Sequence, residues 1–175
     1  MKAKDIAFVT LDGKEHFVDK WDLLIAHPPC TYLSNAGARH LWKGHKLNRE
    51  RFELGLEAKL FFLQFLNAPI KRICVENPVP SKIYKLPKYT QTIQPYMFGH
   101  PYSKRTCLWL DGLPELKATN IVDLIATWCP SGSYSHKHGE QHKGMFTRDR
   151  AKMRSKTFEG IAKAMAEQWG GLGNV

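Results

Sequence analysis

The sequence lacks several features that would assign a protein to a special class. It has four cysteines in 175 residues, and no two of them form a Cys-x-x-Cys pair. No apolar run approaches the roughly 20 residues that a membrane-spanning helix needs. The first residues, Met1 to Asp5, do not provide the apolar core of a secretory signal, and the chain has no internal repeat or low-complexity tract. We therefore expect an intracellular protein with no membrane partner, whose cysteines stay reduced.

Acidic residues are few relative to basic ones, and the formal net charge is +10. Otherwise the chain has the length of one domain, and its 43% hydrophobic and 24% charged residues match an ordinary globular protein. The excess of positive charge favours a polyanionic partner, most simply nucleic acid, although a solvated charged face is the alternative. The residues that we expect to contact nucleic acid come from two basic clusters: Lys43, Lys46, Arg49, Arg148, Arg150, Lys152 and Arg154.

The first half of the sequence predicts a strand, a helix and a second strand. The run from Trp21 to Ala26 is continuously apolar, as in a strand buried on both faces, and it ends at Pro28-Pro29. Apolar residues then recur at helical spacing up to Leu66, with Asn48 as the N-cap. The run from Lys71 to Val75 predicts the next strand, which completes a right-handed βαβ unit. We expect the apolar face of the helix to hold Phe52, Leu56, Leu60, Leu63 and Leu66.

Other elements are predicted around this unit. Asp5 to Thr10 and Arg105 to Leu110 have strand patterns, and Phe158 to Trp169 has a helical pattern with Thr157 as its N-cap. Less distinct are a weak strand at Thr90 to Met97, a helix or strand at Ile121 to Ala126, and a loop at Pro130 to Gly144. We expect an α/β fold over residues 1–175, a small single-domain three-layer sandwich with a mostly parallel sheet. Residues 130–156 would form a flexible, basic and His-rich loop within it.

The predicted strands bring a thiol and a carboxylate together. Cys30 follows the first strand of the βαβ unit, and Glu76 follows the second. Ligands of α/β sheets bind where parallel strands end, so we expect these two side chains to lie side by side. Cys74 and Cys107 instead lie within apolar strand patterns, and we expect both in the core.

Three motifs around these residues resemble those of the cytosine-5 DNA methyltransferases. That family carries Pro-Pro-Cys-Gln-x-Phe-Ser-x-Ala-Gly, and residues 28–37 match it at Pro, Pro, Cys, Ser, Ala and Gly. The family's Glu-Asn-Val appears as Glu76-Asn77-Pro78. Its Gly-x-Pro-Gln-x-Arg-x-Arg resembles residues 99–106, where Tyr102 replaces the Gln, Lys104 the first Arg and Thr106 the second. The closing helix after residue 157 resembles the family's last helix more weakly.

The resemblance implies a specific chemistry. Cys30 would attack C6 of a pyrimidine, and Glu76 would stabilise the ring at N3. Asn77 would orient the loop, and Lys104 or Arg105 would hold a phosphate or help to activate the thiol. A base inside duplex DNA would have to be flipped out to reach them. The residues implied to bind the substrate are Pro29, Ser34, Asn77, Lys104 and Arg105.

Two parts of the family are not evident in this sequence. S-adenosylmethionine, the methyl donor, is implied as the cofactor, but the residues before Cys30 contain no Gly-rich loop, and there is no room for a target-recognition insert. We therefore expect either a partner chain that supplies the donor-binding half or a different electrophile. The family resemblance places the protein in the cytoplasm of a bacterial or phage-infected cell. Two alternatives stay open: a catalytically inactive module that binds nucleic acid or a nucleotide, and an enzyme that acts on free pyrimidine nucleotides.

A further cluster contains potential zinc ligands, but its spacing matches no zinc signature, so we expect a solvated loop and no metal there. Its four members are Cys129, His136, His138 and His142.

Overall fold

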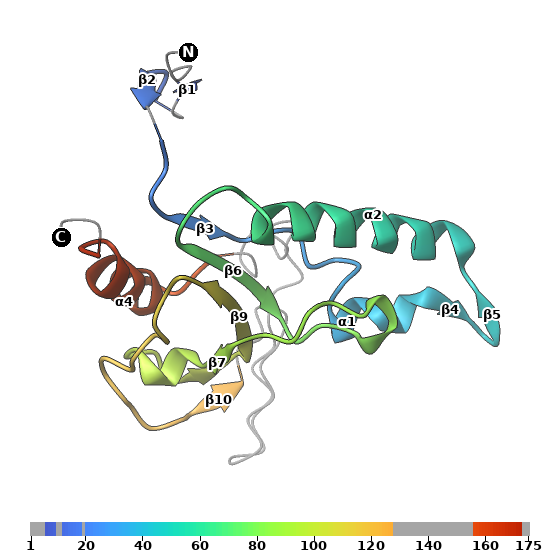
Figure 1. Cartoon of the computed structure of the whole chain (residues 1–175). Coiled ribbons are helices and arrows are strands. Elements are labelled where there is room, and N and C mark those ends of the chain that lie inside the picture. Colours follow the sequence, from blue (N-terminus) through green and yellow to red (C-terminus); the bar gives the residue numbers. More distant parts are fainter. Residues whose placement is uncertain (1–5, 10–11, 19, 128–155, 173–175) are drawn as a thin grey trace.

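A computed structural model describes residues 6–9, 12–18, 20–127 and 156–172. Its centre is a four-stranded sheet in the order β3-β6-β9-β7. The strands are β3 (Leu24–Ala26), β6 (Ile73–Pro78), β9 (Thr106–Asp111) and β7 (Gln91–Ile93). Figure 1 shows the sheet with α2 (Arg49–Leu66) on one side and α4 (Glu159–Trp169) on the other. The predicted combination of helices and strands in three layers is therefore present.

The sheet is mixed, and the expectation of a mostly parallel sheet is corrected. β3 and β6 are parallel, joined through α2 as the βαβ pattern predicts. β9 runs antiparallel to both β6 and β7. An apolar strand sequence does not encode the direction of its neighbour, and mixed sheets commonly carry antiparallel strands at one side. β3 is also an edge strand of three residues, with Trp21 43% exposed, rather than a strand buried on both faces.

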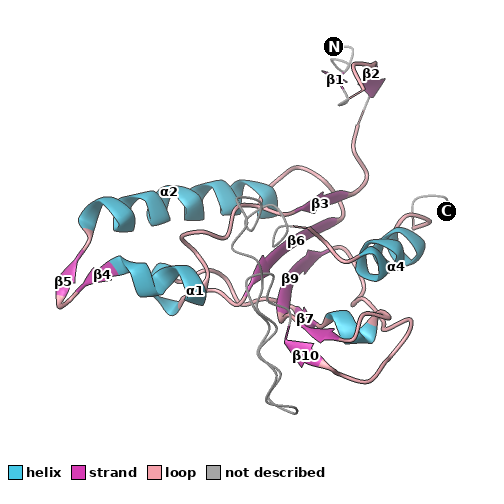
Figure 2. Cartoon of the chain, turned by 180° about the vertical axis from the view of Figure 1, so that it is seen from behind, coloured by secondary structure: helices cyan, strands magenta, loops and turns pink. Residues whose placement is uncertain are grey.

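The N-terminal segment forms a hairpin outside the central sheet. β1 (Ile6–Val9) pairs antiparallel with β2 (Glu15–Val18), a strand that the sequence did not predict. The turn includes Gly13, whose φ of +81° suits glycine. Figure 2 shows this hairpin apart from the central sheet, at the end of the segment that leads into β3.

α2 covers one face of the sheet. Asn48 caps the helix, because its side-chain oxygen accepts a hydrogen bond from the backbone N–H of Arg51, as predicted. Phe62 is fully buried. Its ring packs edge-on against the ring of Trp109 of β9, and the two ring centres are 4.9 Å apart. The predicted apolar face is only partly correct, because Leu56 and Leu60 are 41% and 64% exposed. The helix turns Gly55 and Phe62 inward instead.

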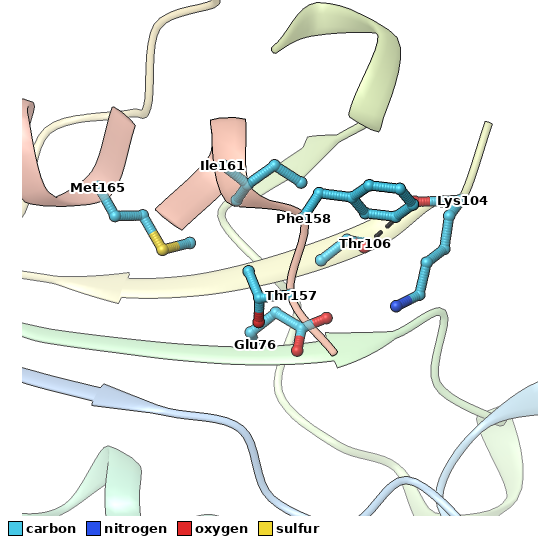
Figure 3. A pocket seen from close by; sticks show the side chains of 7 residues that line it. All are labelled: Glu76, Lys104, Thr106, Thr157, Phe158, Ile161 and Met165. Atoms are coloured by element: carbon cyan, nitrogen blue, oxygen red, sulfur yellow. Dashed lines mark hydrogen bonds between the residues drawn. The ribbon is translucent and has the colours of Figure 1, made fainter. Parts of the chain in front are cut away.

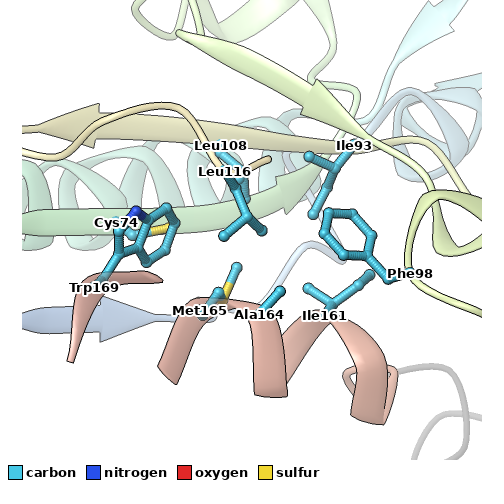
Figure 4. Packing of buried hydrophobic residues seen from close by; sticks show 9 residues of the cluster. All are labelled: Cys74, Ile93, Phe98, Leu108, Leu116, Ile161, Ala164, Met165 and Trp169. Atoms are coloured by element: carbon cyan, nitrogen blue, oxygen red, sulfur yellow. The ribbon is translucent and has the colours of Figure 1, made fainter. Parts of the chain in front are cut away.

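α4 covers the opposite face. Its buried side chains pack against Cys74 of β6 and Leu108 of β9, as Figure 4 shows. These side chains are Ile161, Ala164, Met165 and Trp169. The N-cap is Phe158 rather than the predicted Thr157, and the cap has no side-chain bond of its own. The Nε2 atom of His100 accepts the hydrogen bond of the Gly160 N–H instead, at 3.0 Å. A residue from a distant loop therefore completes the start of this helix.

Short elements connect these layers. After β3 come α1 (Asn35–Ala38), a 3-10 turn η1 (Arg39–Leu41), and the strands β4 (Trp42–Lys43) and β5 (Lys46–Leu47). The 3-10 turns η2 (Lys82–Tyr84) and η3 (Pro95–Met97) flank β7, so the predicted strand at 90–97 is only three residues long. β8 (Tyr102–Ser103) pairs with β10 (Ala126–Thr127), and most of 121–126 is neither helix nor strand.

None of the helices that the structure describes is long and apolar enough to cross a membrane.

Candidate functional site

The ends of β3 and β6 meet at one edge of the sheet. Their parallel register aligns Ala26 with Val75, and the next residues along the two strands are His27 and Glu76. His27 Nδ1 lies 2.9 Å from Glu76 Oε2. An ionised carboxylate only accepts hydrogen bonds, so Nδ1 is the donor. The Glu76 side chain is 19% exposed and that of His27 is 37% exposed, so the pair lies at the surface end of the sheet and remains reachable.

Asn77, near the end of β6, joins this strand to the loop that follows β3. Its Nδ2 donates a hydrogen bond of 2.9 Å to the carbonyl oxygen of Pro28, and the residue is only 1% exposed. Its Oδ1 is buried and accepts no hydrogen bond from the described part of the chain. The predicted orienting role of Asn77 thus has a structural counterpart, because it holds the backbone two residues before Cys30 against the end of β6.

The backbone around Cys30 is held by a tight turn. The Ser34 N–H donates to the Cys30 carbonyl at 3.1 Å, and the Gly37 N–H donates to the Ser34 hydroxyl at 3.1 Å. A Cβ on Gly37 would lie 2.0 Å from the Thr31 carbonyl oxygen, so this turn requires glycine. Arg51 of α2 donates to the carbonyl oxygens of both Thr31 and Gly37. Ser34, expected to bind substrate, is 5% exposed and serves this turn.

The turn is also joined to the segment that follows Glu76. The Asn35 N–H donates to the Val79 carbonyl at 3.0 Å, and the Ser81 N–H donates to the Leu33 carbonyl at 2.7 Å. Together with the Asn77 contact, these bonds join the Cys30 loop to β6 and the segment after it. The sequence analysis expected Glu76 in a loop after the strand, with its side chain beside that of Cys30, whereas Glu76 lies within β6.

A small pocket lies beside Glu76 on the α4 side of the sheet. Its apolar wall comes from α4, and its polar side comes from Glu76, Lys104 and Thr106. Figure 3 shows the charged ends of Glu76 and Lys104 on the same side of the pocket. The Lys104 ammonium lies 5.8 Å from the centre of the Phe158 ring, within the range of a cation–π contact. The lining residues are Glu76, Lys104, Thr106, Thr157, Phe158, Ile161 and Met165.

Cys30 is not one of the residues that line this pocket. Its side chain is half-buried, and within the described ranges no hydrogen bond joins it to Glu76. Lys104 is brought to Glu76, whereas Arg105 is exposed and only partly offsets the rise that burial causes in the pKa of Cys107, which packs on the α2 side. Pro29 is exposed. The structure therefore unites Glu76 with Lys104, and ties Cys30 to both only through its loop.

Sequence reasoning missed several members of the site. His27 precedes Pro28, and the parallel register that predicts the Cys30 and Glu76 loops would also have placed it opposite Glu76. Thr157 was assigned only a capping role, and Phe158 only the start of a helix, yet both line the pocket. No local signal could have revealed them, because α4 reaches Glu76 across a gap of about eighty positions in the chain.

The described cysteines differ strongly in environment. Burial raises the pKa of Cys74 to about 12, with a smaller contribution from the Glu76 carboxylate. Burial likewise raises the pKa of Cys107 to about 11. Both are 0% exposed and lie in the core, as predicted. Cys30 is the half-exposed one among these three, which is what a nucleophile requires.

The first basic cluster lies on an exposed hairpin. Lys43 and Lys46 are on β4 and β5, and Arg49 starts α2; all three are exposed. The other expected contacts, Arg148, Arg150, Lys152 and Arg154, lie outside the described residues, as do Cys129, His136, His138 and His142. In the ranges that the structure covers, no three metal-ligating side chains gather.

The described N-terminal residues do not fit S-adenosylmethionine in the expected way. A donor loop would join a strand to the N-terminus of a helix, where backbone N–H groups are available. β1 instead turns at Gly13 directly into the antiparallel strand β2.

Comparisons with protein-family models, with curated proteins and with solved structures find no match to this chain.

Proposed function

We propose that this chain is a cytosine-5 DNA methyltransferase-like protein that activates a pyrimidine base, with a truncated Rossmann-like domain. In this proposal Cys30 attacks C6 of the base. Glu76 binds N3 and the exocyclic amine, and Lys104 binds a phosphate. The hairpin of β1 and β2 offers no helix N-terminus for the donor, so this function needs a partner that supplies donor binding or a different electrophile.

The observation that carries the proposal is the bond from Asn77 to the Pro28 carbonyl. It supports the proposal because it couples two motifs 49 positions apart at the residues where base activation needs them. A nucleophile and a carboxylate must face one base together, and a buried amide is a rigid link between their loops.

The chemistry can be written without a methyl donor. Cys30 Sγ adds to C6, and the electron pair of the C5–C6 double bond moves towards C5. The negative charge that develops at N3 is neutralised by a proton that the Glu76 carboxyl takes up from solvent and donates to N3, and this proton returns to solvent when the thiolate leaves. In D2O, C5 then takes up a deuteron. When C5 loses its original proton and the C6–S bond breaks, the thiolate is restored and the base carries deuterium at C5.

This exchange is the test. A cytosine-containing oligonucleotide is incubated with the protein in D2O, and deuterium at C5 is measured by mass spectrometry. We expect exchange with the wild type and none with Cys30→Ser. Glu76→Gln should slow it by about 100- to 1,000-fold. Glu57→Gln is the matched control, since Glu57 is exposed on α2 away from the pocket residues. Exchange only in free cytidine monophosphate would overturn the DNA substrate, and no exchange at all would overturn catalysis.

A second candidate is a non-catalytic module that holds nucleic acid through the same loops. The contact between His27 and Glu76 Oε2 favours it, because one carboxylate oxygen is already engaged. Under this function no deuterium enters cytosine, whereas binding of an oligonucleotide survives Cys30→Ser and Glu76→Gln.

A further inference from the structure

The β4–β5 hairpin has two chemically different faces. Its register pairs Trp42 with Leu47 and Lys43 with Lys46. Successive side chains of a strand point to opposite faces, so the tryptophan and leucine share one face and the lysines share the other. Gly44 turns the hairpin with a φ of +60°, a conformation that glycine adopts without strain.

Both faces are unfavourable for a hairpin in water alone. Trp42 is 51% exposed and Leu47 is 38% exposed, so a large apolar area remains hydrated. Lys43 and Lys46 are exposed and directly opposite each other, and like charges in this arrangement repel. One kind of occupant would relieve both costs: a polyanion that also carries flat rings.

We propose that this hairpin, defined here as residues 42–47, is a binding site for single-stranded nucleic acid. A base stacks on Trp42 on one face, and the nucleic acid continues around the narrow hairpin so that its phosphates contact Lys43 and Lys46 on the other face, with Arg49 at the start of α2 as a further cation. A single strand fits better than a duplex because its unpaired bases expose their ring faces to an indole. The inference rests on the proposed function only for the class of partner, and it does not require Cys30 to react.

The hairpin is attached firmly to the Cys30 loop. Leu41, directly before it, is 1% exposed, and the Asn48 N–H directly after it donates to the Leu41 carbonyl at 2.9 Å. Arg51 then bonds the Thr31 carbonyl next to Cys30. Figure 1 shows β4 and β5 at the opposite end of the molecule from α4. Nucleic acid bound to the hairpin would therefore be bound to a part of the protein that hydrogen bonds connect to the Cys30 turn.

The test is the binding of a fluorescently labelled single-stranded oligonucleotide to the full chain, measured by anisotropy over a range of salt concentrations. Trp42→Ala should weaken binding by about five- to a hundredfold, the range expected for one stacked base, with the salt slope unchanged. Trp42→Phe should restore most of this loss. The pair Lys43→Gln with Lys46→Gln should reduce the slope of log K against log salt by about 1.4. Trp21→Ala is the matched control, because Trp21 is similarly exposed but lies outside the hairpin, before β3.

The outcomes separate this inference from the proposed catalysis. Trp42→Ala should weaken binding whether or not the wild type exchanges deuterium, whereas Cys30→Ser and Glu76→Gln test exchange, and Glu57→Gln should bind the oligonucleotide as the wild type does. Unchanged affinity in Trp42→Ala, or an equal loss in Trp21→Ala, would overturn the stacking role. Stronger binding of a duplex than of a single strand would overturn the choice of partner. A thermal unfolding curve of each variant checks that a loss of binding is not a loss of fold.

Discussion

His27 Nδ1 and Glu76 Oε2 lie 2.9 Å apart, so a histidine at the end of β3 meets a carboxylate of β6 from 49 positions away. The contact uses one carboxylate oxygen. Glu76 Oε1 accepts no hydrogen bond from the described residues, and the side chain lines the pocket. The histidine therefore limits the orientations of Glu76 while one oxygen stays available to a ligand.

Removing the histidine should affect the reaction more than the fold. Under the proposed function we expect His27→Ala to lower the C5 exchange rate by about three- to tenfold, the value of one hydrogen bond. His27→Asn, which keeps an N–H donor, should retain more of the rate. The free energy of unfolding should fall by less than ~1 kcal/mol, because the pair is partly exposed. Exchange rates and urea unfolding measure the two effects, and a loss of stability with an unchanged rate would assign His27 a purely structural role.

Asn77 should be important for both stability and the Cys30 loop. Asn77→Ala removes a buried hydrogen bond and leaves the Pro28 carbonyl unsatisfied, so the free energy of unfolding should fall by about 1–3 kcal/mol. Alkylation of Cys30 should become faster as the loop loosens. Asn67→Ala, at an exposed asparagine after α2, should stay within about 0.5 kcal/mol of the wild type. Equal effects of the two substitutions would contradict the role of Asn77 as a link.

Thiol labelling should distinguish the described cysteines. In a Cys129→Ser background, iodoacetamide should modify Cys30 in the native protein and leave Cys74 and Cys107 unmodified, because both are 0% exposed. All three should react after denaturation in urea. Peptide mass spectrometry identifies the modified residues. Labelling of Cys74 before Cys30 would contradict the burial of Cys74 between the sheet and α4.

Alkaline pH should destabilise the protein through the buried thiols. Their folded-state pKa values, about 12 for Cys74 and about 11 for Cys107, lie above the ordinary value of 9.0. Above pH 9 the unfolded chain loses these protons while the folded chain keeps them, so stability is complete below that pH and is lost towards pH 11 to 12. Urea unfolding at several pH values tests this. Cys74→Ala should flatten the decline even though it lowers stability at neutral pH, and an equally steep decline would contradict the prediction.

Gly160 should be intolerant of a side chain. A Cβ there would lie 2.0 Å from the Phe98 carbonyl oxygen, which belongs to the backbone and cannot move aside cheaply. Gly160→Ala should therefore lower the unfolding free energy by more than about 2 kcal/mol and disturb the pocket wall that α4 supplies. In Gly171→Ala the new Cβ meets nothing within 4 Å, so this variant is the control. Chemical unfolding measures the stability of the two variants. Similar stabilities would contradict the close approach of Gly160 to the Phe98 carbonyl.

The local pattern of residues was sufficient for much of the fold. Asn48 caps α2 as predicted, because an N-cap depends on a side chain and the backbone three residues away. The βαβ unit followed from a strand, a helix and a strand in sequence, and it implied that the loops of Cys30 and Glu76 would meet. Cys74 and Cys107 were assigned to the core because free cysteine in an apolar strand packs as a small hydrophobe.

Contacts between distant segments decided the rest. The direction of β9 is set by its pairing with β6 and β7, which apolar residues alone do not specify. Leu56 and Leu60 have the spacing of a core face, but the sheet packs on the side of α2 that carries Gly55 and Phe62. The start of α4 depends on His100 from another loop, and only the docking of that helix brings Phe158 and Thr157 to Glu76. The sequence by itself determined the βαβ unit and the edge where its strands end, because these depend on near neighbours. Only the tertiary structure brought Lys104 and α4 to Glu76, because these contacts depend on packing across the sheet.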